Sequence, residues 1–156
     1  MSRPYYRPET YRAKTAVSYL IRRAHNLILP KFEALFTAHD FTFTQWVVLM
    51  HLRDELADTC SEIARNMHHD NGALTRIVDQ LEARGLVERH RCEIDRRVVR
   101  LSLTPAGRKT VDALIPVATD YLNEVMGGFT KAEGDQLISL LTRLVTRIEE
   151  ADEVKA

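Results

Sequence analysis

The stretch that most constrains the fold is residues 59–104, TCSEIARNMHHDNGALTRIVDQLEARGLVERHRCEIDRRVVRLSLT. It predicts two short helices, a stop at Gly85 and a two-stranded ribbon with an arginine-rich tip. This order is typical of a winged helix-turn-helix, in which one helix enters a DNA major groove and a basic hairpin enters the adjacent minor groove. The sequence therefore predicts a mainly α (α+β) fold that binds double-stranded DNA.

The second predicted helix has an apolar and a polar face, with Asp70 as its N-cap. The apolar stripe consists of Leu74, Ile77, Val78 and Leu81. The residues that point away from it are Gly72, Thr75, Arg76, Asp79 and Gln80. In a DNA major groove, glycine lets the helix backbone approach the DNA closely, threonine contacts a phosphate or a methyl group, and arginine donates two hydrogen bonds to guanine. The alternative is that Arg76 is an ordinary solvated arginine, but the neighbouring elements favour DNA.

In the predicted ribbon, apolar residues 99, 101 and 103 alternate with Arg100 and Ser102, the pattern of a half-buried strand. Residues 93–97 form the turn, where Asp95 is placed to brace the Arg97 guanidinium for a narrow minor groove. A charged turn that serves only solubility is the alternative. The complete predicted DNA-binding set is His69, Asn71, Gly72, Ala73, Thr75, Arg76, Asp95, Arg96 and Arg97.

Charge is unevenly distributed although the formal net charge is zero. Residues 84–109 hold eight Lys or Arg against three acids, a balance of +5. Residues 110–156 hold four Lys or Arg against nine acids, a balance of −5. The basic ribbon therefore keeps a local field that attracts phosphate.

The remaining sequence is helical. A first helix is expected over about 10–38 with a kink at Pro30, and a second helix is expected to begin at the capping box of Thr42 and Gln45. Two more are expected, one from Pro105 to Met126 with a kink at Pro116 and one over about 131–151. Two further capping boxes pair Thr59 with Glu62 and Thr130 with Glu133. The last helix carries an apolar stripe at residues 137, 140, 141, 144, 145 and 148. This stripe packs either within the chain or in an intersubunit bundle of the first, fifth and last helices, and burial of a terminal helix favours the bundle.

These features predict a division into a helical dimerisation region, residues 1–38 and 105–156, and a winged helix-turn-helix lobe, residues 39–104. No apolar run approaches the roughly 18 residues of a membrane span, and the first residues, MSRPYYRPETYR, lack the apolar core of a signal peptide. Two cysteines are too few for a disulfide framework, so a cytoplasmic compartment is expected.

The run GALTRIVDQLEARGLVER, the Asp95-Arg96-Arg97 turn, SLTPAG and FTFTQWVVLMHL together resemble the multiple antibiotic resistance regulator (MarR) family over about residues 10–150. The resemblance implies a triangular, homodimeric winged helix-turn-helix repressor of a pseudo-palindromic operator. The residues that match the family's recognition helix and its Asp-x-Arg wing element are Gly72, Ala73, Thr75, Arg76, Asp95 and Arg97. CEIDRRV departs from the Asn-Pro-bearing turn of many members and predicts a differently shaped wing tip.

The resemblance also implies a site for a small anionic aromatic effector between the dimer arm and the DNA-binding lobe. The aromatic and cationic candidates by position are Tyr19, Arg22, Arg23, His25, Trp46, Met50 and Arg53. For Trp46 the competing interpretation is an ordinary core residue.

Several other functions are weighed against these features. The six histidines show no metal-ligand spacing, and neither a cofactor nor an enzyme site is expected. Neither Cys60 nor Cys92 lies near the N-terminal tyrosines, unlike the peroxide-sensing branch of the family, yet a redox switch through them is an alternative to a ligand. A winged helix that mediates protein–protein assembly is a further alternative. Binding of the protein to heparin would count against that alternative.

Overall fold

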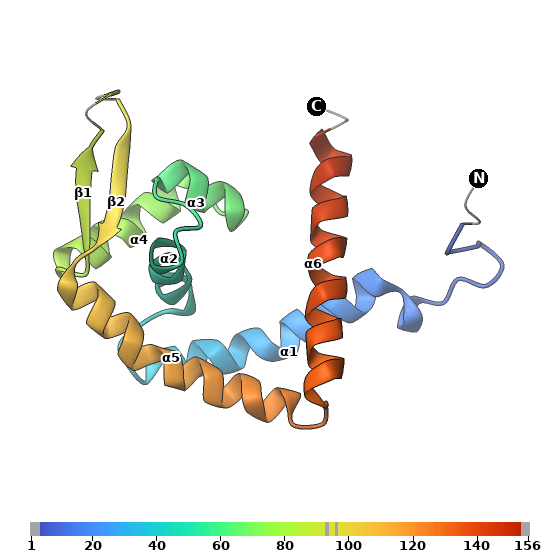
Figure 1. Ribbon diagram of the computed structural model, residues 1–156. Coiled ribbons are helices and arrows are strands. Elements are labelled where there is room, and N and C mark those ends of the chain that lie inside the picture. The colour runs from blue at the N-terminus through green and yellow to red at the C-terminus, as the bar shows by residue number, and fades with distance from the viewer. Residues whose placement is uncertain (1–3, 93, 96, 154–156) are drawn as a thin grey trace. The chain divides into compact units, whose positions relative to one another are not determined.

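The computed structural model describes residues 4–92, 94–95 and 97–153, without the side chains of residues 152 and 153. The described chain is mainly helical, with one small sheet (Figure 1). In chain order the elements are η1 (Ala13–Thr15, a 3-10 helix), α1 (Val17–Thr37), α2 (Phe43–Arg53), α3 (Cys60–Asn66), α4 (Asn71–Ala83), β1 (Val87–Arg91), β2 (Val99–Leu103), α5 (Pro105–Met126) and α6 (Lys131–Glu153). The mainly α prediction with a two-stranded ribbon is confirmed.

The chain forms two compact units, residues 1–117 and residues 118–156. The first unit has a core to which α1, α2, α3, α4, both strands and the start of α5 contribute. Its largest fully buried side chains include Phe36, Leu49, Ile63, Leu74 and Leu81. Trp46 is only 6% exposed and stacks on Phe36, with ring centroids 4.9 Å apart. Trp46 is therefore a core residue, as the alternative interpretation proposed.

The three capping boxes predicted at helix starts form to different degrees. At α2 the Thr42 hydroxyl accepts the Gln45 N–H at 3.1 Å while the Gln45 side chain accepts the Thr42 N–H at 3.0 Å, so the predicted box is complete. Thr130 and Glu133 make the same reciprocal pair at α6. At α3 the Thr59 hydroxyl accepts the Glu62 N–H, but the Glu62 carboxylate accepts from that hydroxyl instead of the backbone. This third box is therefore only half formed.

The expected first helix differs from the prediction at its start. Residues 13–15 form a short 3-10 helix, Ala16 is extended, and α1 begins only at Val17. The Tyr6 hydroxyl accepts the Val17 N–H at 2.9 Å, a long-range contact with one of the first N–H groups of α1. Pro30 and Pro116 lie inside α1 and α5, as predicted, and the kinks at these prolines stay predictions.

Strands β1 and β2 pair antiparallel, with Val87 opposite Leu103 and Arg91 opposite Val99. The Leu101 N–H donates to the Asp58 carbonyl at 2.7 Å, which ties the loop between α2 and α3 to β2. Leu101 and Leu103 are buried, but Val99 is 39% exposed. The expected alternation therefore fails at the tip of the hairpin, because the strands extend beyond the core there.

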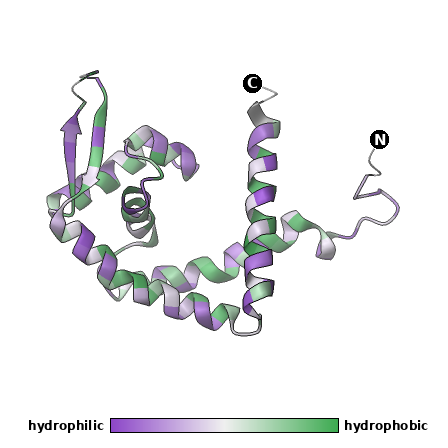
Figure 2. Ribbon diagram, in the orientation of Figure 1, coloured by the Kyte–Doolittle hydropathy of each residue, from purple (hydrophilic) through white to green (hydrophobic). Residues whose placement is uncertain are grey.

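The second unit contains the end of α5, the Gly127–Gly128 connection and α6. Apolar and polar residues alternate along α6 (Figure 2). Most of the predicted apolar stripe is exposed in the single chain: Leu137, Leu140, Leu141, Val145 and Ile148. None of the described helices is both long enough and apolar enough to cross a membrane.

Candidate nucleic-acid interface

Helix α4 presents its polar first turns to solvent. Asp70 caps it as predicted, because its carboxylate accepts the Ala73 N–H at 2.8 Å. The Thr75 hydroxyl donates to the Asn71 carbonyl at 2.8 Å, which holds this side chain against the helix. His69, Asn71, Gly72, Thr75 and Arg76 are exposed and Ala73 is half-buried. The start of α4 therefore offers a partner a surface of small and polar residues that includes the exposed Arg76.

The opposite face of α4 anchors it in the first unit. Leu74, Val78 and Leu81 are fully buried, and Gly85 ends the helix with a φ of +68°. The Gln45 amide, part of the α2 capping box, donates to the Gln80 side chain at 2.9 Å. Because Gln45 is buried, this bond locks α4 to α2 with little freedom to slide.

Arg89 on β1 joins the hairpin to α4. Its guanidinium donates to Asp79 at 2.7 Å and to Glu82, carboxylates one turn apart on α4. Burial opposes the charge on Arg89, but the hydrogen bond that it donates to Asp79 and the two nearby carboxylates outweigh this and raise the pKa of the guanidinium. Arg89 thus holds the base of the hairpin beside the outward face of α4.

The hairpin tip is organised by backbone contacts. Cys92 N–H donates to the Val98 carbonyl and Val98 N–H to the Asp95 carbonyl, both at 2.9 Å. Asp95 accepts the backbone N–H of Arg97 at 3.0 Å. The expected brace between Asp95 and the Arg97 guanidinium is therefore corrected to a brace on the backbone, because the aspartate closes a local turn onto the nearest N–H two residues on. Residues 93 and 96, including the predicted contact Arg96, lie outside the described residues.

A groove connects the polar face of α4 with the hairpin. It encloses about 780 Å³, and its lining includes Thr75 from α4, Arg65 from α3, and Arg89 and Arg97 from the hairpin. The structure therefore brings Thr75 and Arg97, members of the predicted set far apart in sequence, to one surface. Arg65 and Arg97 favour an anionic partner along this groove. Glu62 and Asp79 also line it, and Asp79 pairs with Arg89.

Comparisons with known proteins agree with this architecture. The family model described as "MarR family" matches residues 41–99, the span from the start of α2 to the start of β2. The chain carries a MarR-family domain. Its fold and this domain are those of MarR-family DNA-binding transcriptional regulators, and the resemblance inferred from the motifs is confirmed.

Solved structures of MarR-type regulators are similar over most of the chain. BpsR of Bordetella bronchiseptica is 29% identical, with a TM-score of 0.73 over 86% of this chain and 96% of that one. BldR of Sulfolobus solfataricus is 25% identical, with a TM-score of 0.76 over 86% and 95%. A MarR mutant from E. coli is 27% identical, with a TM-score of 0.71 over 83% and 96%.

Within the MarR-family domain, α3 and α4 form the helix-turn-helix and β1 and β2 form the wing. The sequence analysis missed two basic residues of this site, Arg65 and Arg89. For Arg89 a signal was available: Asp79 and Glu82 lie on one helical face, one turn apart, and an arginine follows the Gly85 stop by four residues. Their meeting depends on the chain reversal at Gly85, which brings β1 back along α4.

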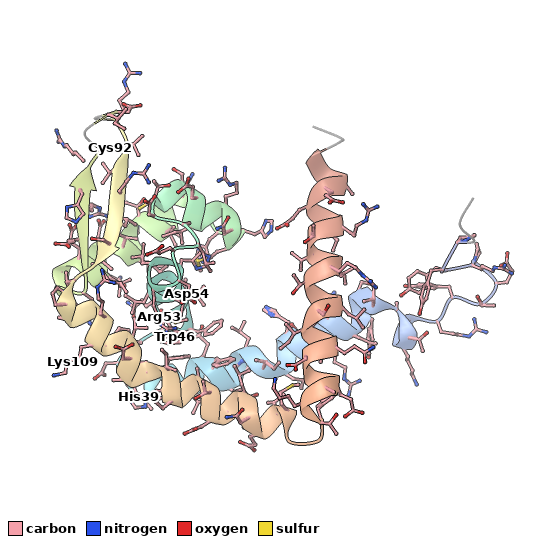
Figure 3. All side chains as sticks on the ribbon, in the orientation of Figure 1. His39, Trp46, Arg53, Asp54, Cys92 and Lys109 are labelled. Carbon is pink, nitrogen blue, oxygen red and sulfur yellow. The ribbon has the colours of Figure 1, made fainter. Side chains whose placement is uncertain are left out.

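The predicted effector residues separate into groups in the structure. Tyr19, Arg22 and Arg23 line a concavity of about 410 Å³ along α1, and Arg23 donates to the Tyr19 hydroxyl at 3.4 Å. Trp46 is in the core and lines no part of this concavity. Arg53 on α2 pairs with Asp54 at 3.4 Å, Met50 is half-buried and His25 is exposed on α1 (Figure 3).

Both cysteines are free thiols, Cys60 at the start of α3 and Cys92 near the far end of the hairpin (Figure 3). Backbone N–H groups of Asp95 and then Ile94 hydrogen-bond the Cys92 sulfur and, with Arg100 nearby, lower the pKa of this thiol. Arg100 also pairs with Asp58 at 2.5 Å. No group of three or more His, Cys, Asp or Glu suited to a metal occurs within residues 4–92, 94–95 and 97–153.

Proposed function

We propose that the protein is a homodimeric transcriptional repressor that binds a pseudo-palindromic operator. In each subunit the start of α4 enters the major groove and the wing reaches the adjacent minor groove. The observation that carries this proposal is the exposed set Gly72, Thr75 and Arg76 on a capped, anchored helix beside a basic hairpin. Arg76 donates two hydrogen bonds to a guanine in the major groove, whereas Arg97 contacts the DNA backbone and the narrow minor groove.

Dimerisation is supported by the apolar surface of α6. A monomer rarely leaves a long contiguous apolar stripe in water. The polar residues between the stripe positions keep the opposite face of α6 soluble. A second copy that covers the stripe removes apolar area from water and places two recognition helices on successive turns of the duplex.

The test is a gel shift with operator duplexes selected by the wild-type protein from a randomised pool. Arg76→Ala should weaken binding by about 1–3 kcal/mol and relax specificity at one base pair per half-site. Arg97→Ala should weaken binding to all sequences evenly and reduce the salt dependence. Arg143→Ala, on the exposed surface of α6, is the matched control and should bind as the wild type. If Arg76→Ala and Arg97→Ala both bind the operator as tightly as the wild type, the proposed docking of α4 and the wing on DNA is wrong.

The proposed effector is a small anionic aromatic acid. DNA binding by BpsR is regulated by 6-hydroxynicotinic acid. The concavity on α1 offers the matching chemistry, with two guanidinium groups for a carboxylate and the Tyr19 ring for an aromatic face. A ligand releases DNA only if it favours the arrangement of the protein that fits the operator less well.

A thermal-shift screen of aromatic acids, with 6-hydroxynicotinate included, tests the effector. A stabilising acid should also release the operator, and Arg22→Ala and Arg23→Ala should each reduce both effects. Arg53→Ala is the matched arginine control outside the concavity. No hit in the panel, together with oxidation-dependent DNA release that is lost in Cys60→Ser or Cys92→Ser, favours the redox alternative.

A further inference from the structure

The tip of the wing carries an isoleucine that has no role inside the fold. Ile94 is 99% exposed, the highest value among the described large apolar side chains. Its neighbours at the tip are charged, so an aliphatic side chain at this position is unfavourable for the isolated protein in water. A single exposed apolar side chain is common on protein surfaces, so it is the position of Ile94 at the tip of a basic hairpin that suggests a partner.

The turn holds Ile94 in place through its backbone. The Cys92 N–H donates to the Val98 carbonyl and the Val98 N–H to the Asp95 carbonyl, both at 2.9 Å. Asp95 also accepts the Arg97 N–H at 3.0 Å. Cys92 before the isoleucine and Asp95 after it are thus held by hydrogen bonds, while the Ile94 side chain stays exposed. Such preorganisation lowers the entropic cost of inserting the side chain into a binding site.

The charges around Ile94 specify the kind of partner. Residues 87–103 contain five arginines and three acids, a balance of +2, and Arg91 and Arg97 are exposed. Arg97 also lines the groove that runs from the wing to Thr75 of α4. Glu93 and Asp95 flank Ile94 in sequence and Arg91 and Arg97 lie beyond them, so it is the hairpin as a whole that is basic. An apolar tip on a basic hairpin matches the DNA minor groove, where phosphates border stacked bases. Continuity with the α4 groove favours DNA over an anionic lipid surface.

We propose that Ile94 is a minor-groove wedge that inserts at a base step beneath the wing and partly unstacks it. The inference rests on the proposed operator binding and adds a specificity-determining residue to it. A wedge makes no base-specific hydrogen bond. It selects sequence through the ease of deformation, so the operator should carry a flexible pyrimidine–purine step, TA or CA, under each wing.

The experiment uses full-length protein and operator duplexes selected from a randomised pool with the wild type. Ile94→Ser, Ile94→Leu and the control Leu56→Ser, which alters an exposed leucine of the same unit, are compared by gel shift. 2-Aminopurine at the step under the wing reports unstacking through increased fluorescence. Ile94→Ser should lose about fivefold to twentyfold in affinity, because the removed aliphatic surface is no longer buried, and should lose the fluorescence increase. Ile94→Leu and Leu56→Ser should keep both.

Circular dichroism of each variant verifies that folding is unchanged. If the wild type binds its operator and Ile94→Ser equals it in affinity, fluorescence and step preference, the wedge is overturned while operator binding stands. If the wild type selects no DNA from the pool, both proposals are overturned. Binding to phosphatidylserine vesicles that requires Ile94, with DNA binding independent of it, overturns the wedge in favour of a lipid contact.

Discussion

Arg89 shows how a single side chain holds the wing in register with the recognition helix. Arg89 lies on β1, and its guanidinium donates hydrogen bonds to Asp79 and Glu82 of α4. The side chain is 26% exposed, so solvent only partly screens these charges. A second residue of this kind is Cys92, whose N–H donates to the Val98 carbonyl across the turn that carries Ile94. Both residues act on the proposed DNA-facing surface through the backbone and helix that they position.

Arg89→Ala should lower the free energy of unfolding by about 1–2 kcal/mol, because two hydrogen bonds to charged groups are lost from a partly exposed site. Operator affinity should fall as well, since the wing loses its tie to α4. Urea denaturation and gel shift measure the two effects. Arg108→Ala, at an exposed position of α5, is the control. An unchanged unfolding midpoint contradicts the assigned role.

The Cys92 thiol should be alkylated by iodoacetamide faster than Cys60 near neutral pH, because its lowered pKa raises the thiolate fraction. The unfolded thiol ionises at a higher pH than the folded one. The thiolate therefore stabilises the fold fully above the unfolded pKa, and this contribution is lost as the pH falls through the folded pKa. Mass spectrometry of the two labelled cysteines, and the pH dependence of unfolding in wild type and Cys92→Ser, test this. Equal labelling rates count against it.

At the scale of elements, the start of α5 lies against the segment that leads into β1. Thr104 N–H donates to the Leu86 carbonyl at 3.1 Å, and the Thr104 hydroxyl accepts the Gly107 N–H at 2.9 Å. A Cβ built on Gly107 would lie 2.0 Å from the Leu86 carbonyl oxygen. Only glycine fits this approach, so the first turn of α5 and the wing base are placed by one residue without a side chain.

Gly107→Ala should lower the free energy of unfolding by about 1–3 kcal/mol or more, since the clash is with backbone and forces the two segments apart. The matched control is Gly128→Ala, where a Cβ meets nothing within 4 Å. Thermal and urea unfolding of both variants provide the comparison. A Gly107→Ala protein as stable as the control would show that α5 can move away from Leu86 without cost.

At the scale of the whole molecule, the exposed stripe on α6 is the feature that a single chain does not satisfy. Its residues recur every three or four positions along one face of the helix. The proposed homodimer accounts for this face, and with it for a palindromic operator. Charge is also separated at this scale, since the basic wing and the acidic C-terminal part occupy different regions of the sequence.

Leu141→Asp should convert the dimer to a monomer or to an unfolded chain, because a buried unpaired carboxylate at the centre of the stripe is strongly unfavourable. Operator binding should be lost with it. Ser139→Asp, an exposed position outside the stripe on the same helix, should leave both properties intact. Light scattering after gel filtration measures the oligomeric state. A dimeric Leu141→Asp protein with normal DNA affinity would rule out this face as the interface.

Local signals in the sequence determined the helices and most of their ends; the start of α1 at Val17 is an exception. The caps at Thr42, Asp70 and Thr130, the stop at Gly85 and the buried stripe of α4 depend on residues within four positions of each other. Such short-range hydrogen bonds and periodicities can be read directly from a chain. The MarR-type motifs and the polar face of α4 follow from the same local information.

Tertiary structure alone decided which distant side chains meet. Arg89 reaches α4 only because the chain reverses at Gly85, and Thr75 and Arg97 share a groove only because the wing folds back beside α4. Trp46 and Tyr19 were both aromatic candidates for the effector site, with a core position as the alternative for Trp46. Trp46 is in the core and Tyr19 lines a surface concavity. Residue type sets the chemistry that a side chain offers. Burial and contact are set by the packing of elements far apart in sequence, which no local pattern contains.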